Sequence, residues 1–141
     1  MIEKVQESHL YMWLKEKDSK FLSKLDETIE YANTILPQIN NVFASYTVHG
    51  VRHSINVMEY MYALVVDINK LSELEVALLI YSALLHDIGM IANVDEIKEI
   101  KADHAILGER KYSKVLEKYG DEMTALQECV RPVHGKRARD Y

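Results

Sequence analysis

The sequence predicts an all-α protein, and three observations support this. Only five glycines and two prolines occur in 141 residues, so few positions are strong helix breakers. Apolar residues recur at three- and four-residue spacing along several segments, as they do on one face of a helix. Ser72 and Glu75 form an S-x-x-E capping box directly before the apolar segment VALLIYSALL. We expect a bundle of about six helices.

In the first half of the chain, residues 1–17 can form an amphipathic helix. Asp18 or Ser19 can cap a second helix, which Pro37 ends, kinks or restarts. Residues 38–50 are the best candidate for a loop, because they contain asparagines and a glycine. A third helix is expected over 51–68.

In the second half, the capping box opens a helix that reaches the end of the apolar segment. Gly89 is expected to terminate that helix in a left-handed conformation. Asp95 and Asp103 are plausible caps for a short helix and for a longer one over residues 104–119. A last helix is expected from about Asp121 to Val130, and Pro132 would stop it.

Composition restricts the class of protein. The net charge of −5 disfavours general binding to nucleic acid or to an acidic membrane. No stretch approaches the roughly 20 apolar residues that a bilayer span needs, and the charged N-terminus lacks the apolar region of a signal peptide. The single cysteine, Cys129, suits a reducing compartment. We expect one cytoplasmic domain, in which an N-terminal helical segment (1–45) packs on a core (46–141).

The candidate metal-binding residues lie at the edges of apolar segments. His86 and Asp87 follow the most apolar segment, and an unpaired carboxylate is costly to bury. His53 falls at the apolar edge of the 51–68 helix, and His104 shares a face with apolar residues of the 104–119 helix. Taken singly, each histidine can be a hydrogen-bonded core residue, and the His-Asp pair can be a helix cap. Together, imidazole nitrogens and a carboxylate are a ligand set for divalent transition metals.

Two phrases resemble a known family. HGVRHSINVMEYM, followed by LLIYSALLHDIGM, is similar to the HD superfamily of metal-dependent phosphohydrolases, whose domains are all-helical and carry an H…HD…D signature. The resemblance implies that His53, His86 and Asp87 bind a first metal and that Asp87 can bridge to a second. DHAILGERKY and CVRPVHGKR resemble later segments of such domains, which makes His104 and His134 candidates for the second metal. We assign Asp87 and His104 to the catalytic set.

The sequence departs from the family pattern in two places. The last Asp of the signature is not found. Asp95, Asp103 and Asp121 are expected to be helix caps, and Asp140 is next to the final residue. We therefore expect an HD-like bundle truncated at its C-terminus, with a downstream domain or a second copy of the chain supplying the missing helix. The glycine-tyrosine-proline motif of cyclic-dinucleotide phosphodiesterases is also absent from the sequence.

Several other residues receive weaker assignments. Arg52, Arg131 and Lys136 are candidates for contacts with substrate phosphates, although a solvated surface is the default for such residues. His49 precedes His53 by four residues but falls in the expected loop. We expect the His9 side chain to pack in the core or to be partly exposed.

The resemblance implies a metal-dependent phosphohydrolase with a small phosphorylated substrate, a nucleotide or another phosphoester. The cofactor would be one or two divalent metal ions, and the ligand set does not choose among Mn, Fe, Zn, Ni, Co and Mg. The alternative is a non-catalytic HD-like module for regulation or assembly. The missing Asp and the N-terminal helical segment favour that alternative.

Overall fold

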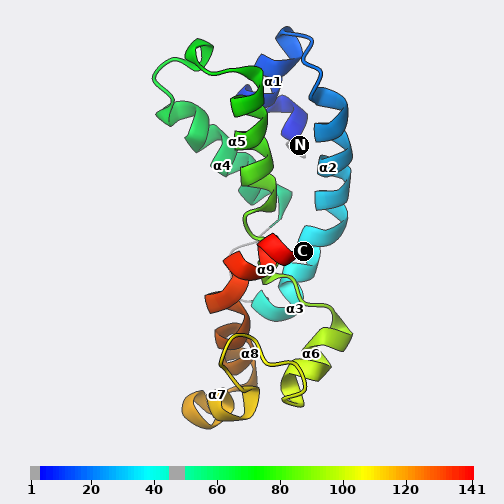
Figure 1. Cartoon of the computed structure of the whole chain (residues 1–141), viewed down its shortest axis with the longest axis vertical. Coiled ribbons are helices and arrows are strands. Elements are labelled where there is room, and N and C mark those ends of the chain that lie inside the picture. Colours follow the sequence, from blue (N-terminus) through cyan, green and yellow to red (C-terminus); the bar gives the residue numbers. More distant parts are fainter. Residues whose placement is uncertain (1–3, 45–49) are drawn as a thin grey trace. The chain divides into compact units, whose positions relative to one another are not determined.

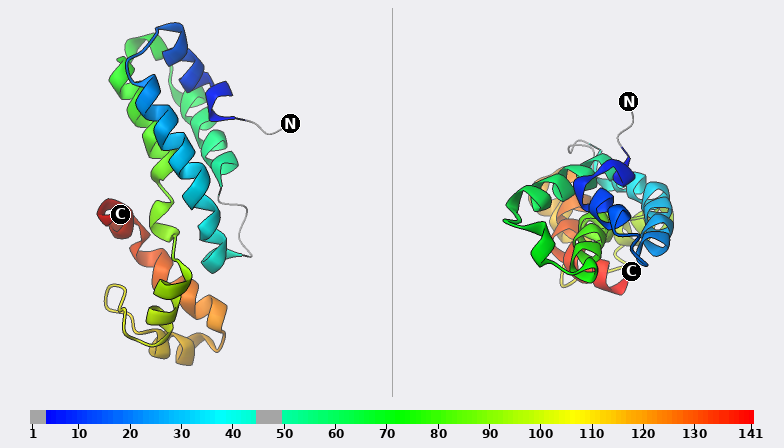
Figure 2. Two further views of the ribbon diagram at one scale, coloured as in Figure 1. Left: turned by 90° about the vertical axis from the view of Figure 1, so that its right-hand side faces the viewer. Right: turned by 90° about the horizontal axis from the view of Figure 1, so that it is seen from above.

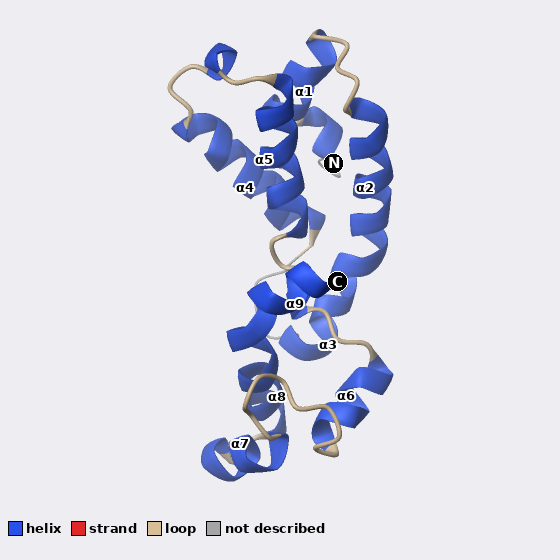
Figure 3. Cartoon of the chain, viewed as in Figure 1, coloured by secondary structure: helices blue, strands red, loops and turns tan. Residues whose placement is uncertain are grey.

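The computed structural model describes residues 4–44 and 50–141, and helices make up most of these ranges (Figure 3). The described residues contain no strand, so the prediction of an all-α fold is confirmed. The α-helices are α1 (His9–Glu16), α2 (Leu22–Ile35), α3 (Asn40–Phe43), α4 (Val51–Leu64), α5 (Glu73–Leu85), α6 (Val94–Lys101), α7 (Tyr112–Tyr119), α8 (Glu122–Val130) and α9 (His134–Asp140). Short 3₁₀ turns are η1 (Val5–Glu7), η2 (Leu36–Ile39), η3 (Ile68–Lys70), η4 (Ile88–Met90) and η5 (Arg131–Val133).

The chain divides into two compact units, each made of two chain segments. The first unit comprises residues 1–34 and 48–85, and the second comprises residues 35–47 and 86–141. Both units are helical in the ranges that the structure describes. The boundary expected near residue 45 stays a prediction.

The first unit is built around the antiparallel pair α4 and α5, against which α1 packs (Figures 1 and 2). Because the two helices run in opposite directions, the start of α4 and the end of α5 lie at the same end of the pair (Figure 1). Helix α5 is apolar on nearly all sides, and its inward side chains are fully buried. The buried side chains of this unit include Leu10, Leu14, Leu25, Ile29, Met58, Val76, Ala77, Ile80, Ala83 and Leu84.

The predicted capping box is present at the start of α5. The Ser72 backbone N–H and hydroxyl donate to the Glu75 carboxylate at 2.7 and 2.8 Å, and the Ser72 hydroxyl accepts from the Glu75 N–H at 3.3 Å. These bonds lower the pKa of Glu75, the backbone bond being the largest cause. The cap therefore fixes where the apolar helix begins.

The second unit consists of short helices. Helix α7 packs on α8, α3 packs on α8, and α9 packs on η4, the turn that follows Asp87. Its buried side chains include Ile39, Val42, Phe43, Met90, Ile91, Ile100, Leu126, Cys129 and Val130.

The helix predicted over 104–119 is wrong in its first half. Asp103 and Gly108 adopt φ values of 58° and 64°, which a helix cannot contain, and α7 begins only at Tyr112. The N-cap residue of α7 is Lys111 and not Asp103, but the Asp103 carboxylate accepts from the backbone N–H of Ser113, in the first turn of that helix, at 3.1 Å. The Ser113 side chain and backbone lower the pKa of Asp103.

Other boundaries also differ from the prediction. Residues 40–43 of the expected loop form α3, and the 51–68 helix ends at Leu64. The short helix after Asn93 is capped by Asn93, whose side chain accepts from the Glu96 N–H at 2.8 Å, and not by Asp95. Asp121 caps α8 as predicted. Pro132 does not end the helical structure, because it lies in the 3₁₀ turn η5 and α9 follows directly.

Within the described residues, no single helix is long and apolar enough to cross a membrane. Two successive helical stretches, Glu73–Met90 and Val94–Lys101, meet the length and composition criteria only when they are taken together.

Candidate metal site

His53 lies in the first turn of α4. Gly50 is the N-cap residue, in an extended conformation, and its carbonyl accepts from the backbone N–H of His53 at 2.8 Å. Ser54 and Ile55, which follow His53, are buried, and the His53 side chain is half-buried. The helix start thus holds the imidazole at the margin of the first unit's core.

His86 and Asp87 follow α5 without a break, since Leu85 is the last residue of that helix. The Nε2 atom of His86 lies 3.1 Å from an Asp87 carboxylate oxygen. The exposed fractions of the two side chains are 38% and 13%. The carboxylate is therefore largely withdrawn from water, while the imidazole remains accessible.

One ligand atom from each of His53, His86 and Asp87 lies within 4.8 Å of the ligand atoms of the other two. The directions of α4 and α5 explain this, because His53 opens the first helix and His86 follows the end of the second. Bonds from a metal to imidazole nitrogen or carboxylate oxygen are about 2.0–2.2 Å, so two ligands of one ion lie at most about 4.4 Å apart. The three donors fit one divalent ion after a small adjustment of their side chains.

The turn after Asp87 is fixed by a close approach of two backbones. A Cβ atom at Gly89 would lie 1.8 Å from the carbonyl oxygen of His134 and 2.6 Å from the backbone N of Ala138. Gly89 therefore allows α9 to lie against η4. The predicted left-handed cap at Gly89 is wrong, because among the described glycines only Gly108 and Gly120 have positive φ.

Arg137 ties the same turn to α9. Its guanidinium donates to the carbonyl oxygens of Gly89 at 2.8 Å and Ile91 at 2.6 Å, and to the Glu96 carboxylate at 2.6 Å. Its side chain is 17% exposed. The sequence alone did not identify this role of Arg137. No local signal distinguishes it from Lys136, which is exposed.

His134 is the first residue of α9, the helix that packs on η4. Its Nδ1 lies 2.6 Å from the carbonyl oxygen of Arg131, which favours the tautomer with hydrogen on Nδ1. Nε2 would then have its lone pair available. A role of His134 toward a second metal stays a prediction.

His104 is not on an inward helix face, in contrast to the prediction. It lies in the turn after α6, its side chain is 69% exposed, and its Nδ1 is 3.2 Å from a carboxylate oxygen of Glu99. The cause is the pair of positive φ values at Asp103 and Gly108, which end the helical periodicity there. Its metal-binding and catalytic roles also stay predictions.

The remaining candidates lie mainly on the surface. Arg52 and Arg131 are exposed, and Arg131 lies 3.4 Å from the Glu128 carboxylate. His9 is 64% exposed, bonds the Glu59 carboxylate and stacks on Tyr62 with ring centroids 4.7 Å apart. This agrees with the packing role expected for it. His49 lies outside the described residues.

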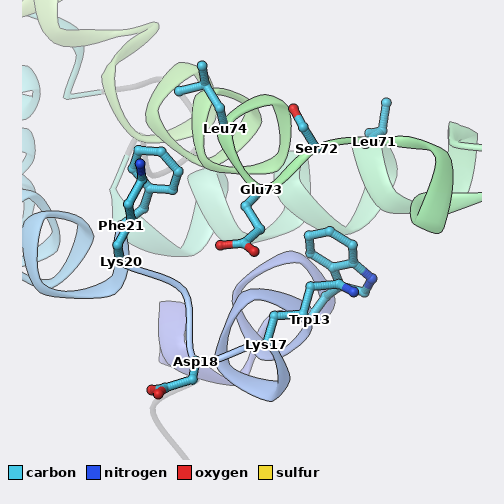
Figure 4. A pocket seen from close by; sticks show the side chains of 9 residues that line it. All are labelled: Trp13, Lys17, Asp18, Lys20, Phe21, Leu71, Ser72, Glu73 and Leu74. Carbon is cyan, nitrogen blue, oxygen red and sulfur yellow. The ribbon is translucent and has the colours of Figure 1, made fainter.

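A groove of about 640 Å³ in the first unit contains none of the candidate metal ligands. The Glu73 carboxylate points into it between the rings of Trp13 and Phe21 (Figure 4). Lys17 and Lys20 lie over these two rings, 4.5 and 5.3 Å from their centroids. Lysines and carboxylates are thus mixed in this groove, so it does not select for a phosphate.

Comparison with known proteins supports the HD resemblance. The family model HD-CE, which describes an HD-domain-related family, matches residues 43–141. Comparison with curated proteins and with solved structures returned no match. The matched range includes His53, His86 and Asp87 and covers more than half of the chain. The chain belongs to the HD-CE family.

Proposed function

We propose that this chain is a metal-dependent phosphohydrolase that acts on a nucleotide or another phosphoester. The observation that carries the proposal is the group of ligand atoms from His53, His86 and Asp87, which lie within 4.8 Å of one another. Membership of an HD-domain-related family supports it.

In this proposal His53 and His86 contribute neutral imidazole nitrogens and Asp87 contributes a charged oxygen. A divalent ion bound to them would lower the pKa of a coordinated water to about 7 and screen negative charge on phosphoryl oxygens. Asp87 holds its carboxylate in a largely water-excluded position, where its charge acts more strongly on an ion than it would in water. His86 keeps one face toward solvent, from which a substrate can approach.

The other assignments extend this proposal. His104 and His134 would support a second ion, and Arg52, Arg131 and Lys136 would contact substrate phosphates. The nitrogen-rich donor set suits Fe, Co, Ni or Zn better than Mg or Mn, which prefer oxygen ligands. A cytoplasmic location and self-association of the chain remain predictions.

The alternative is a non-catalytic HD-like module for regulation or assembly. One observation favours it: among the described residues, the donor group contains one carboxylate and not the two of the H…HD…D signature. A metal held by such a set would stabilise the native state without supporting turnover.

Hydrolysis of a generic phosphodiester and of nucleoside phosphates, measured with each divalent metal, separates the two functions. Replacing Asp87 by Asn keeps the shape but removes the charge, and we expect it to lower kcat/KM about a hundredfold or more. The matched control is Asp95→Asn, because Asp95 is an exposed carboxylate paired with Lys98. Metal binding by the unmodified chain without hydrolysis of any substrate would favour the regulatory module.

A further inference from the structure

A second hollow, of about 450 Å³, lies beside α7 in the second unit. Basic side chains dominate its wall: Arg110, Lys111, Lys114 and Lys118. This is a concentration of positive charge in a chain whose net charge is −5. Lys114 and Lys118 are four residues apart in α7, where like charges repel, and Lys111 is the N-cap residue of that helix. Lys114 also pairs with the Glu117 carboxylate at 3.1 Å, in a contact exposed to solvent. An anion in the hollow would relieve that repulsion.

The two glutamates of the hollow, Glu109 and Glu128, offset only part of the charge of its four basic residues. Glu128 is engaged by arginines: its carboxylate lies 3.6 Å from Arg110 and 3.4 Å from Arg131. Its carbonyl oxygen also accepts from Arg110 at 2.9 Å. These contacts hold the Arg110 guanidinium in place, so it loses little freedom on meeting a ligand. Glu109, which also lines the hollow, is exposed.

The same hollow has an apolar part. Val115 lies four residues before Tyr119 on the lysine-bearing side of α7, and both line the hollow. The Tyr119 side chain is 41% exposed, with the Lys118 ammonium 4.9 Å from its ring centroid. A flat ring could stack on this exposed aromatic face. The volume falls within the range of small-molecule sites, which is about 300–1,000 Å³.

We propose that this hollow binds a small phosphorylated ligand that carries a planar ring, such as a nucleoside phosphate. Its phosphates contact Arg110, Lys111 and Lys114, and its ring packs on Tyr119. The hollow shares no lining residue with the His53, His86 and Asp87 group, so the inference goes beyond the proposed hydrolase activity.

The test is calorimetric titration with ATP, inorganic triphosphate and adenosine in excess chelator, so that binding through a metal is eliminated. We expect ATP to bind and adenosine to show no measurable binding, because the phosphates supply the charge contacts. The double variant Lys111→Glu/Lys114→Glu should weaken ATP binding about tenfold or more. Lys98→Glu, which reverses another exposed lysine of the second unit, should leave ATP binding unchanged.

The contact with the ring has its own test. Tyr119→Ala should weaken ATP binding about three- to tenfold and leave triphosphate binding unchanged, with the fold checked by circular dichroism. Absence of ATP binding, or equal loss in Lys98→Glu and in the double variant, would overturn the site. Equal effects of Tyr119→Ala on ATP and triphosphate would overturn recognition of a ring. Tighter binding of a single-stranded oligonucleotide than of ATP would overturn the assignment of a small ligand.

Discussion

The two units are stabilised differently, although both are helical. In the first unit, apolar side chains of α5 interdigitate with α1 and α4, and long-range polar contacts such as Tyr11 to Asp26 join side chains. In the second unit, side chains tie distant backbone segments together: Asn41 donates to the Ala92 carbonyl, Gln127 to the Val42 carbonyl and Arg137 to the Gly89 carbonyl. The first unit has such a tie too, from the backbone N–H of His9 to the Glu59 carboxylate at 3.0 Å. Short helices and 3₁₀ turns depend more on ties of this kind than long apolar helices do, because they bury less apolar surface.

This difference matters for the candidate metal ligands. His53 is carried by a regular helix, whereas Asp87 directly precedes η4, a turn whose position depends on Gly89 and Arg137. We therefore expect substitutions outside the metal group to disturb the position of the Asp87 carboxylate more than that of the His53 imidazole.

The largest effect is expected from Gly89→Ala. The added methyl group would overlap the backbone of α9, which cannot move as a flexible side chain can, so we expect destabilisation of about 3 kcal/mol or more. Urea unfolding followed by circular dichroism measures it. Gly135→Ala is the matched control, because a Cβ atom there meets nothing within 4 Å. Equal stability of the two variants would show that α9 does not lie against Gly89.

A somewhat smaller loss is expected from Arg137→Met, which keeps much of the side-chain volume. It leaves the carbonyl oxygens of Gly89 and Ile91 without this donor, at a cost of about 2–4 kcal/mol. Arg139→Met is the control, since the Arg139 side chain is 73% exposed and bonds only its neighbour Asp140 among the contacts described. Thermal melts that shift equally for both variants would contradict the role of Arg137.

These two residues also mark the limit of what the sequence could predict. The Ser72 capping box, the Asp121 cap and the start of α4 at Val51 are local signals, and the structure contains them. Gly89 contacts α9, which begins 45 residues further along the chain, and Arg137 lies in α9 and bonds back to the turn at Gly89. No local sequence pattern reveals a contact between segments so far apart.

The candidate site divides in the same way. The motif residues around His53 and Asp87 could be found from their context, and their donor atoms lie close together. The helical position predicted for His104 is wrong because the apolar periodicity does not continue through Asp103 and Gly108, whose left-handed conformations end it. A glycine within an apparent helix is the warning sign that the sequence offers.

The smallest effect is expected in the first unit, from Tyr11→Phe. Burial, followed by the bond to Asp26 at 2.8 Å, raises the pKa of Tyr11 from its usual 10.0 to about 12. The folded state holds the Tyr11 proton more tightly than the unfolded state does. The protonated hydroxyl therefore adds its full contribution to the free energy of unfolding below pH 10, and this contribution is lost as pH rises toward 12. We expect a loss of about 1 kcal/mol at neutral pH. The stability difference between wild type and Tyr11→Phe should shrink between pH 10 and pH 12; a constant difference would contradict this.

The proposed function depends most on the binding of one divalent ion by His53, His86 and Asp87. The most direct measurement is a Co²⁺ titration followed by visible absorption, performed on wild type, His53→Gln, Asp87→Asn and His9→Gln. We predict saturable binding by wild type and His9→Gln, and affinity about a hundredfold lower or more in the other two variants. Equal Co²⁺ affinity in all four proteins would contradict the metal site.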